Sequence, residues 1–234
     1  MVYKWLNNIQ SRLLPQYCIL CGQAGQEHMA MCHECYNELN FITNCCTQCA
    51  LPLPESASGL ICGKCLQYPP HFDRSVSLFT YEPPASHLVQ GLKFGKRLNL
   101  ARLLGDMLAI RLDGASALPD CIAPVPLSGR RTRSRGFNQS MEIARPVGRK
   151  LGIPLKPALL TRTINTPPQS KLAIKERRRN VRGAFRLNGD NPPRHIAIVD
   201  DVVTTGSTVN EIARILKKSG VETVEIWSVA RAII

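Results

Sequence analysis

The chain has 234 residues, of which 44% are apolar, and it carries a formal net charge of +13. This length and composition are those of a globular protein with one domain of ordinary size and one small domain. No stretch approaches the roughly 18 uninterrupted apolar residues that a membrane span requires. The N-terminus lacks the pattern of a signal peptide. We therefore expect a cytoplasmic protein.

The first 17 residues are expected to form a separate amphipathic helix. Their apolar side chains recur at the three- and four-residue spacing of one helix face. We expect this face to pack on the body of the protein, and the alternative is peripheral contact with the inner face of the membrane. The residues of this face are Tyr3, Trp5, Leu6, Ile9, Leu13 and Leu14.

Residues 18–70 contain four C-x-x-C pairs, which we interpret as a metal-binding domain. Cysteines of a reducing compartment are metal ligands more often than disulfide partners. Two such pairs complete one tetrahedral zinc site, so four pairs predict two structural zinc ions. Apolar residues are sparse here, and metal binding would supply much of the folding free energy. The expected ligands are Cys18, Cys21, Cys32, Cys35, Cys46, Cys49, Cys62 and Cys65.

Several alternatives remain open for this domain. Iron–sulfur ligation or a disulfide framework would use the same cysteines. Pairing in chain order is the simplest arrangement, and a cross-braced arrangement has the same spacing. Cys45 could replace Cys46 by a slip of one residue. Cys121 stands in an apolar run and is expected to be a buried thiol.

Residues 71–234 alternate between apolar strands and helical patterns. Because the strands are almost continuously apolar, we predict an α/β fold with a parallel sheet and helices on both of its faces. Pro146 and Gly148 are expected to kink or shorten their helix. The predicted strands are Arg74–Glu82, Cys121–Leu127, His195–Asp201 and Thr223–Ala230, and the predicted helices are Ala85–Lys93, Leu98–Leu112, Asn138–Leu151 and Thr208–Ser219.

Two carboxylates and a hydroxyl-rich loop follow the apolar run Ile196–Val199. Ligands of open parallel sheets bind at the carboxyl ends of the strands, where Asp200 and Asp201 are expected. The next residues, Thr204–Thr208, open a helix, and their backbone N–H groups and hydroxyls suit a phosphate. Vicinal ribose hydroxyls suit the carboxylates. A ribose 5-phosphate satisfies both halves of this pattern, and the chain has no Walker A sequence.

The basic charge is concentrated in one segment. Arg130–Arg186 contains sixteen Lys and Arg residues against only Glu142 and Glu176, whereas Met1–Phe72 is close to neutral. A segment of this charge favours a polyanionic partner, either phosphates of a small molecule or a nucleic-acid backbone.

The stretch Ile196–Thr208 resembles the phosphoribosyl pyrophosphate (PRPP) signature of type I phosphoribosyltransferases. Three further motifs and the cysteine-rich domain extend the likeness over essentially the whole chain, which resembles the ComF/GntX family. This family includes competence proteins of naturally transformable bacteria. The motifs are QGLKFGKR (Gln90–Arg97), APVPLSGRRTRSRGFNQS (Ala123–Ser140) and PPQSKLAIKERRRNVRGAF (Pro167–Phe185).

The resemblance implies a type I phosphoribosyltransferase-like domain after a double zinc ribbon, and it assigns roles to individual residues. Asp200 and Asp201, at the catalytic positions, would bind the ribose hydroxyls directly or through Mg²⁺. The 5′-phosphate would lie on Thr204, Thr205, Gly206, Ser207 and Thr208. The pyrophosphate and other anions would contact Arg130, Arg131 and Arg135 and, from a mobile basic loop, Lys171, Arg177 and Arg178.

The function implied by the resemblance is the handling of incoming single-stranded DNA in natural transformation, on a fold that binds PRPP or a related ribose phosphate. The basic segment Arg130–Arg186 would contact the DNA, and the zinc domain would contact proteins of the competence machinery. Two alternatives compete: an active phosphoribosyltransferase (a pentosyl transferase) of nucleotide salvage, and a non-catalytic DNA-binding adaptor. No segment clearly forms the hood with which such enzymes choose their acceptor.

Overall fold

The computed structural model describes residues 16–26, 29–95, 97–115, 117–164 and 181–233. The chain divides into two compact units, Met1–Asn40 and Phe41–Ile234. The division falls between the two groups of cysteines, so the second group belongs to the same unit as the sheet. The predicted helix of residues 1–17 lies, apart from its last two residues, outside the described part of the chain.

Short helices accompany the cysteines, and strand–helix alternation follows them, as the sequence predicts. The unit Met1–Asn40 contains helix α2 (His33–Asn37). The elements of the second unit are η1 (Glu55–Ala57), α3 (Gly63–Gln67), β1 (Arg74–Thr80), α4 (Ala85–Phe94), α5 (Leu98–Leu112), β2 (Cys121–Pro124), α6 (Gly129–Arg135), α7 (Gln139–Leu151), β3 (Leu160–Arg162), β4 (Phe185–Leu187), β5 (His195–Val203), α9 (Ser207–Lys218) and β6 (Thr223–Arg231).

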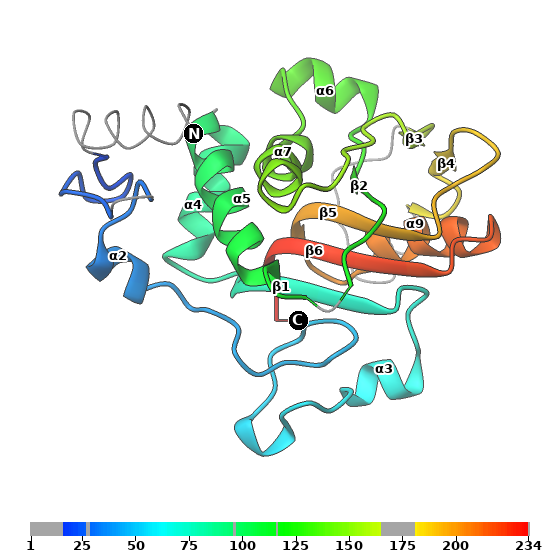
Figure 1. Ribbon diagram of the computed structural model, residues 1–234, viewed down its shortest axis with the longest axis horizontal. Coiled ribbons are helices and arrows are strands. Elements are labelled where there is room, and N and C mark those ends of the chain that lie inside the picture. Colours follow the sequence, from blue (N-terminus) through cyan, green and yellow to red (C-terminus); the bar gives the residue numbers. More distant parts are fainter. Residues whose placement is uncertain (1–15, 27–28, 96, 116, 165–180, 234) are drawn as a thin grey trace. The chain divides into compact units, whose positions relative to one another are not determined.

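Four strands form one parallel sheet in the order β1-β6-β5-β2 (Figure 1). The predicted parallel sheet is therefore confirmed. All four strands differ in length from the prediction. β1 and β2 end earlier, at Thr80 and Pro124, whereas β6 extends to Arg231 and β5 continues past the two aspartates to Val203. Beyond Val199, β5 remains paired with β6 but no longer with β2.

Apolar side chains cover both faces of the sheet. Ile196 and Ile198 of β5 belong to the same buried cluster as Ile212 and Leu216 of α9. Because side chains alternate along a strand, the equally buried Ala197 points to the opposite face. Helices α5 and α7 contact the sheet, and Figure 1 shows them on the face away from α9.

Helix α7 runs through Pro146 and ends at Leu151, so of the two expected effects, a kink or a shortening, the shortening does not occur. Its packing explains why the proline is tolerated. A Cβ atom at Gly105 of α5 would lie 2.3 Å from Pro146 Cγ and 2.6 Å from the Ile143 carbonyl oxygen. The missing side chain at Gly105 thus lets α5 and α7 approach closely, and the buried contact compensates for the lost backbone hydrogen bond.

The antiparallel pair β3–β4 and the helix α6 were not predicted. Strands of three residues are too short to show a period of two. The sequence of α6, GRRTRSR, has no apolar face from which a helix can be recognised. Among the described residues, none of the helices has the length and apolarity needed to cross a membrane.

Candidate functional site

The divergence of β2 and β5 opens a crevice at the carboxyl end of the sheet. Helix α7, downstream of β2, contacts both strands, whereas α9, which follows β5, packs against β5 and β6 on the other face. Adjacent strands whose connections leave on opposite faces form the binding crevice of open α/β sheets. Asp200 and Asp201 lie in β5 immediately beyond the last residue paired with β2. The carboxylates are therefore part of the strand rather than of the loop that follows it.

Asp200 is held by the first turn of α7. Ser140 Oγ donates a hydrogen bond of 3.1 Å to Asp200 Oδ1, which also accepts one of 2.9 Å from the Asp201 N–H. Burial raises the pKa of Asp200 to about 7, and the adjacent charge of Asp201 adds to this shift, while Lys93, the Asp201 N–H and Ser140 oppose it. Asp200 thus holds a proton at a pH at which an ordinary aspartate is ionised.

Asp201 is paired with a lysine that the sequence analysis did not select. Lys93 Nζ, from α4, lies 3.1 Å from Asp201 Oδ1, and both side chains are largely buried. The motif QGLKFGKR contains Lys93, but the motif alone does not show that α4 directs it to β5. A ligand that enters this crevice meets two carboxylates and one ammonium group.

The loop Thr204–Thr208 turns sharply into α9. Gly206, the N-cap of this helix, has a φ of 77°, in the left-handed region that favours glycine. Thr205 Oγ1 and Ser207 Oγ are 2.7 Å apart, and Thr205 Oγ1 accepts a hydrogen bond of 3.3 Å from the Ser207 N–H. The N-terminus of the twelve-residue helix α9 adds its positive dipole end, so the loop is suited to an anion.

One cavity of about 750 Å³ joins these features. Of the predicted site residues, the structure brings Asp200, Asp201, Thr204, Gly206, Ser207, Thr208 and Arg135 to its wall, together with Lys93, Phe94, Gln139 and Ser140. Thr205 lines a second cavity on the other side of the loop. Arg130 and Arg131 lie upstream of Arg135 in α6. Lys171, Arg177 and Arg178 fall outside the described residues.

Arg135 is placed at the cavity by two neighbours. Its Nη1 donates a hydrogen bond of 2.9 Å to Gln139 Oε1, and its guanidinium lies 5.7 Å from the centre of the Phe94 ring. Gln139 is buried, and its Nε2 has no hydrogen-bond partner among the described residues. Gln139 is also one of the residues that line the cavity.

The eight C-x-x-C cysteines form two groups of four, paired in chain order. Within each group all sulfur atoms lie within 4.8 Å of one another. The Sγ atoms of Cys21 and Cys32 are 3.6 Å apart, and those of Cys49 and Cys62 are 3.7 Å apart. A tetrahedral zinc ion with Zn–S bonds near 2.3 Å requires sulfurs about 3.8 Å apart. Both groups therefore fit zinc without rearrangement.

The geometry decides between paired and free cysteines, between the two pairing orders, and between Cys45 and Cys46. Every cysteine in the described chain is free of disulfide bonds. A cross-braced arrangement is excluded, and Cys45 belongs to neither group. The first and third pairs each contain an acidic thiol. Burial opposes ionisation, but backbone N–H groups outweigh it, and the pKa falls to about 6 for Cys18 and to about 7 for Cys46. Thiolate is the form that binds metal.

Comparison with known proteins agrees with both parts. Residues 9–66 match the model of the double zinc ribbon domain, and residues 138–233 match that of the phosphoribosyl transferase domain. The chain is 40% identical to DNA utilization protein YhgH of Salmonella typhimurium over 94% of its length and 99% of that protein. It is 36% identical to competence protein F of Haemophilus influenzae (92% and 96%), and 26% identical to competence protein ComFC of Bacillus subtilis (81% and 79%).

The fold and the site thus define a phosphoribosyltransferase-type α/β protein that carries a double zinc ribbon. The identity to the first two of these relatives exceeds 30% and covers nearly the whole of each chain, so it shows the family. The chain belongs to the ComF/GntX family, together with DNA utilization protein YhgH and competence protein F.

We predict that the purified protein contains about two zinc ions per chain, because each cysteine group has the sulfur spacing of one site. Cys21→Ser and Cys62→Ser should each reduce this to about one, whereas Cys45→Ser should leave the content unchanged. Elemental analysis measures the outcome. Iron in place of zinc, or loss of metal in Cys45→Ser, would contradict the assignment.

Proposed function

We propose that this protein is a ComF-like factor of DNA uptake whose body binds PRPP or a related ribose 5-phosphate in the crevice between β2 and β5. The observation that carries this proposal is the cavity that has Asp200 and Asp201 on one side and the loop Thr204–Thr208 on the other. The names of the relatives, DNA utilization protein and competence protein, supply the cellular context.

The two halves of the cavity match the two ends of the ligand. The loop N–H groups and hydroxyls would hold the 5′-phosphate, and the carboxylates of Asp200 and Asp201 would accept hydrogen bonds from the ribose 2′- and 3′-hydroxyls. Lys93 keeps Asp201 oriented and compensates for part of the negative charge. Ser140 orients Asp200 through the hydrogen bond that its hydroxyl donates. The ribose would then lie with its C1 toward α6.

The pyrophosphate of PRPP would point to the cationic side of the cavity. Arg135 lines this side, held by its hydrogen bond to Gln139. We propose Arg130, Arg131, Lys171, Arg177 and Arg178 as further anion contacts. Carboxylate oxygens beside phosphates are the ligands that Mg²⁺ takes, so Asp200 and Asp201 fit this ion. Bound there with PRPP, Mg²⁺ would neutralise charge on the leaving pyrophosphate.

If the protein is a transferase, the bond from C1 to pyrophosphate breaks as a nucleophile bonds to C1. The contribution of the protein would be positioning and charge stabilisation. Asp200 and Asp201 would hold the ribose while positive charge develops at C1, and the arginines would stabilise the departing anion. An acceptor would enter beside Phe94, whose ring is exposed at this end of the cavity.

We predict that changing Asp200 and Asp201 together to Asn abolishes binding of PRPP with Mg²⁺ and leaves the fold intact, because the amides cannot replace both carboxylates as acceptors and metal ligands. Calorimetric titration of wild type and variant measures the difference. Asp190→Asn, outside the cavity lining, is the matched control. Unchanged affinity in the double variant would contradict the ribose assignment.

The pKa of Asp200 predicts a dependence of stability on pH. A raised pKa means that the folded state binds more protons than the unfolded state between the ordinary value of 3.8 and about 7. The free energy of unfolding should therefore fall as pH rises through this window. Relative to Asp200→Asn, which cannot titrate here, wild type should lose on the order of 1–4 kcal/mol. Urea unfolding from pH 4.5 to 8 tests this, and parallel curves for the two proteins would refute it.

A second candidate, a DNA-binding adaptor without catalysis, is favoured by one exposed arginine–aromatic pair. The Arg135 guanidinium lies over the ring of Phe94. Phe185, the partner of Arg162, is by contrast buried and cannot stack on a base. Phe94 is 74% exposed and comes from outside the basic segment Arg130–Arg186. Bases of single strands stack on exposed aromatics beside cations. Phe94 of α4 thus places an exposed aromatic ring beside Arg135 of the basic segment.

For this second candidate we predict that affinity for oligothymidylate falls steeply with salt concentration, because bound phosphates release counterions. Phe94→Ala should weaken binding by about 1–3 kcal/mol through loss of stacking. Tyr68→Ala, which removes an exposed aromatic of the second zinc ribbon, is the control. Fluorescence anisotropy at several salt concentrations measures both effects. Binding that is independent of salt, or equal losses in the two variants, would count against a stacking surface at α4.

A further inference from the structure

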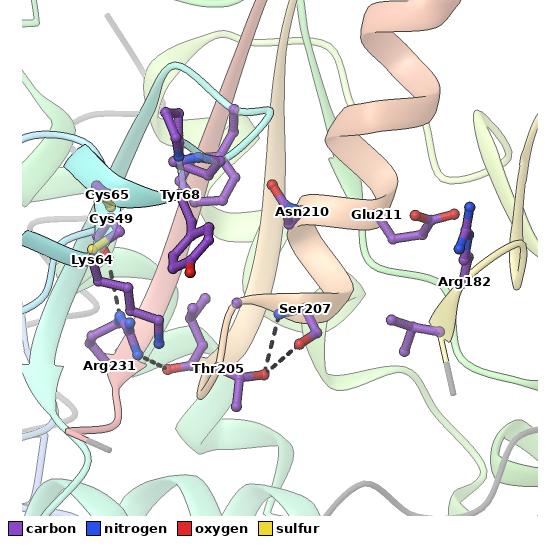
Figure 2. A pocket seen from close by; sticks show the side chains of 16 residues that line it. Cys49, Lys64, Cys65, Tyr68, Arg182, Thr205, Ser207, Asn210, Glu211 and Arg231 are labelled. Atoms are coloured by element: carbon purple, nitrogen blue, oxygen red, sulfur yellow. Dashed lines mark hydrogen bonds between the residues drawn. The ribbon is translucent and has the colours of Figure 1, made fainter. Parts of the chain in front are cut away.

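Arg231, near the end of β6, is a buried cation that donates to main-chain carbonyl groups from distant parts of the second unit. It is only 4% exposed. Its Nε donates a hydrogen bond of 3.0 Å to the Cys49 carbonyl oxygen. Its Nη1 donates to the carbonyl oxygens of Val203 (3.1 Å) and Thr204 and to that of Ala232 (2.7 Å). Figure 2 shows this guanidinium between Cys49 and the loop that carries Thr205 and Ser207.

The carbonyl groups on the two sides of Arg231 belong to different functional elements. Cys49 is a ligand of the second cysteine group, Cys46–Cys49–Cys62–Cys65. Val203 is the last residue of β5, and Thr204 is the first residue of the loop Thr204–Thr208, which we call the phosphate loop after its proposed ligand. A buried guanidinium is costly unless its donors are satisfied, and its planar fork fixes the direction of each hydrogen bond. A shift of the Cys49 carbonyl group would therefore displace the Arg231 guanidinium, which also donates to the carbonyl groups of Val203 and Thr204.

The turn that holds the Cys49 carbonyl is itself shaped by metal ligation. Ala50, which follows Cys49, is fully buried and has a φ of 56°, a left-handed conformation that is uncommon for alanine. Its N–H donates to the Cys46 carbonyl, and the Cys46 N–H donates to the Leu51 carbonyl. These bonds close the turn that aims two sulfurs at one ion. Loss of the ion would remove the constraint that holds the two sulfurs together, and relaxation of the strained Ala50 would then reorient the neighbouring Cys49 carbonyl.

The second cysteine group is also part of the core beneath the phosphate loop. Its four cysteines belong to the same buried cluster as Val203 and as Val209 and Ile212 of α9. A cavity of about 270 Å³ separates this zinc ribbon from the first turn of α9, with Lys64 and Tyr68 on one side and Thr205 and Ser207 on the other (Figure 2). Arg231 is in the wall of this cavity. Its hydrogen bonds to Cys49 and Thr204 connect the zinc ribbon to the loop at the edge of this cavity.

We infer that Arg231 is a positioning residue that couples metal binding at the second cysteine group to the conformation of the phosphate loop. This inference rests on the proposed ribose-phosphate site for its consequence: metal retention at Cys46, Cys49, Cys62 and Cys65 and ribose-phosphate binding assist each other. Such a coupling is reciprocal, because each ligand changes the affinity for the other by the same factor. The first cysteine group lies in the other compact unit and serves as an internal reference.

The coupling is tested by chelator-driven zinc release from the full-length protein with and without ribose 5-phosphate. We expect the ligand to slow the release of one of the two zinc ions by about tenfold, the effect of one hydrogen bond to a charged group. The slowed ion should persist in Cys21→Ser and be absent in Cys62→Ser. In Arg231→Lys, which retains the charge but loses the fork, both ions should bind and the protection should disappear. Equal release with and without bound ligand would overturn the coupling.

Hydrogen exchange of the ligand-free protein separates this inference from the proposed function. Removing the metal from the second group in Cys62→Ser should speed the exchange of amides in residues 202–210 by about tenfold, whereas Cys21→Ser should leave them unchanged. The amides of β6 serve as the reference for an intact fold. If ribose 5-phosphate fails to bind wild type, the proposed function fails, and exchange alone decides the coupling. Unchanged exchange in Cys62→Ser with an intact sheet would overturn it.

Discussion

The site depends on the point at which β5 continues and β2 does not. Pairing of the two strands ends at Pro124 and Val199, while β6 supports β5 for four more residues. Asp200 and Asp201 therefore lie on a strand with one open edge. Helices α7 and α9 lie on opposite faces of the sheet (Figure 1). Ser140 at the start of α7 and the loop at the start of α9 then meet at the same crevice from opposite sides. A loop without this support would not hold the two carboxyl groups at a fixed separation.

The second zinc ribbon is built into the body of the protein. Its cysteines share a buried cluster with α9, and one of their carbonyl groups accepts a hydrogen bond from Arg231 of β6. The first group lies in a separate compact unit. Two sites of nearly identical sequence pattern therefore have different structural surroundings. The second group lies within the buried cluster that also holds Val203 and Val209, and the first group lies outside that unit.

Much of the fold and part of the site could be predicted from the sequence, and the reasons are physical. The strands are buried on both faces, so Ile196–Val199 and its counterparts are recognisable as apolar runs, and C-x-x-C spacing follows from tetrahedral ligation. Lys93, Gln139 and Arg231 were not selected, because their roles arise where helices and strands distant in the chain meet. Arg231 reads as an ordinary cation near the end of a strand. Its burial is visible only once β6 pairs with β5 and Cys49 packs beside it.

The most direct test of the account is a crystal structure of the zinc-loaded protein with ribose 5-phosphate. The account predicts the phosphate on the loop Thr204–Thr208, the ribose hydroxyls within hydrogen-bond distance of Asp200 and Asp201, and C1 directed toward Arg135. A phosphate bound elsewhere on the basic surface, with an empty crevice between β2 and β5, would contradict it.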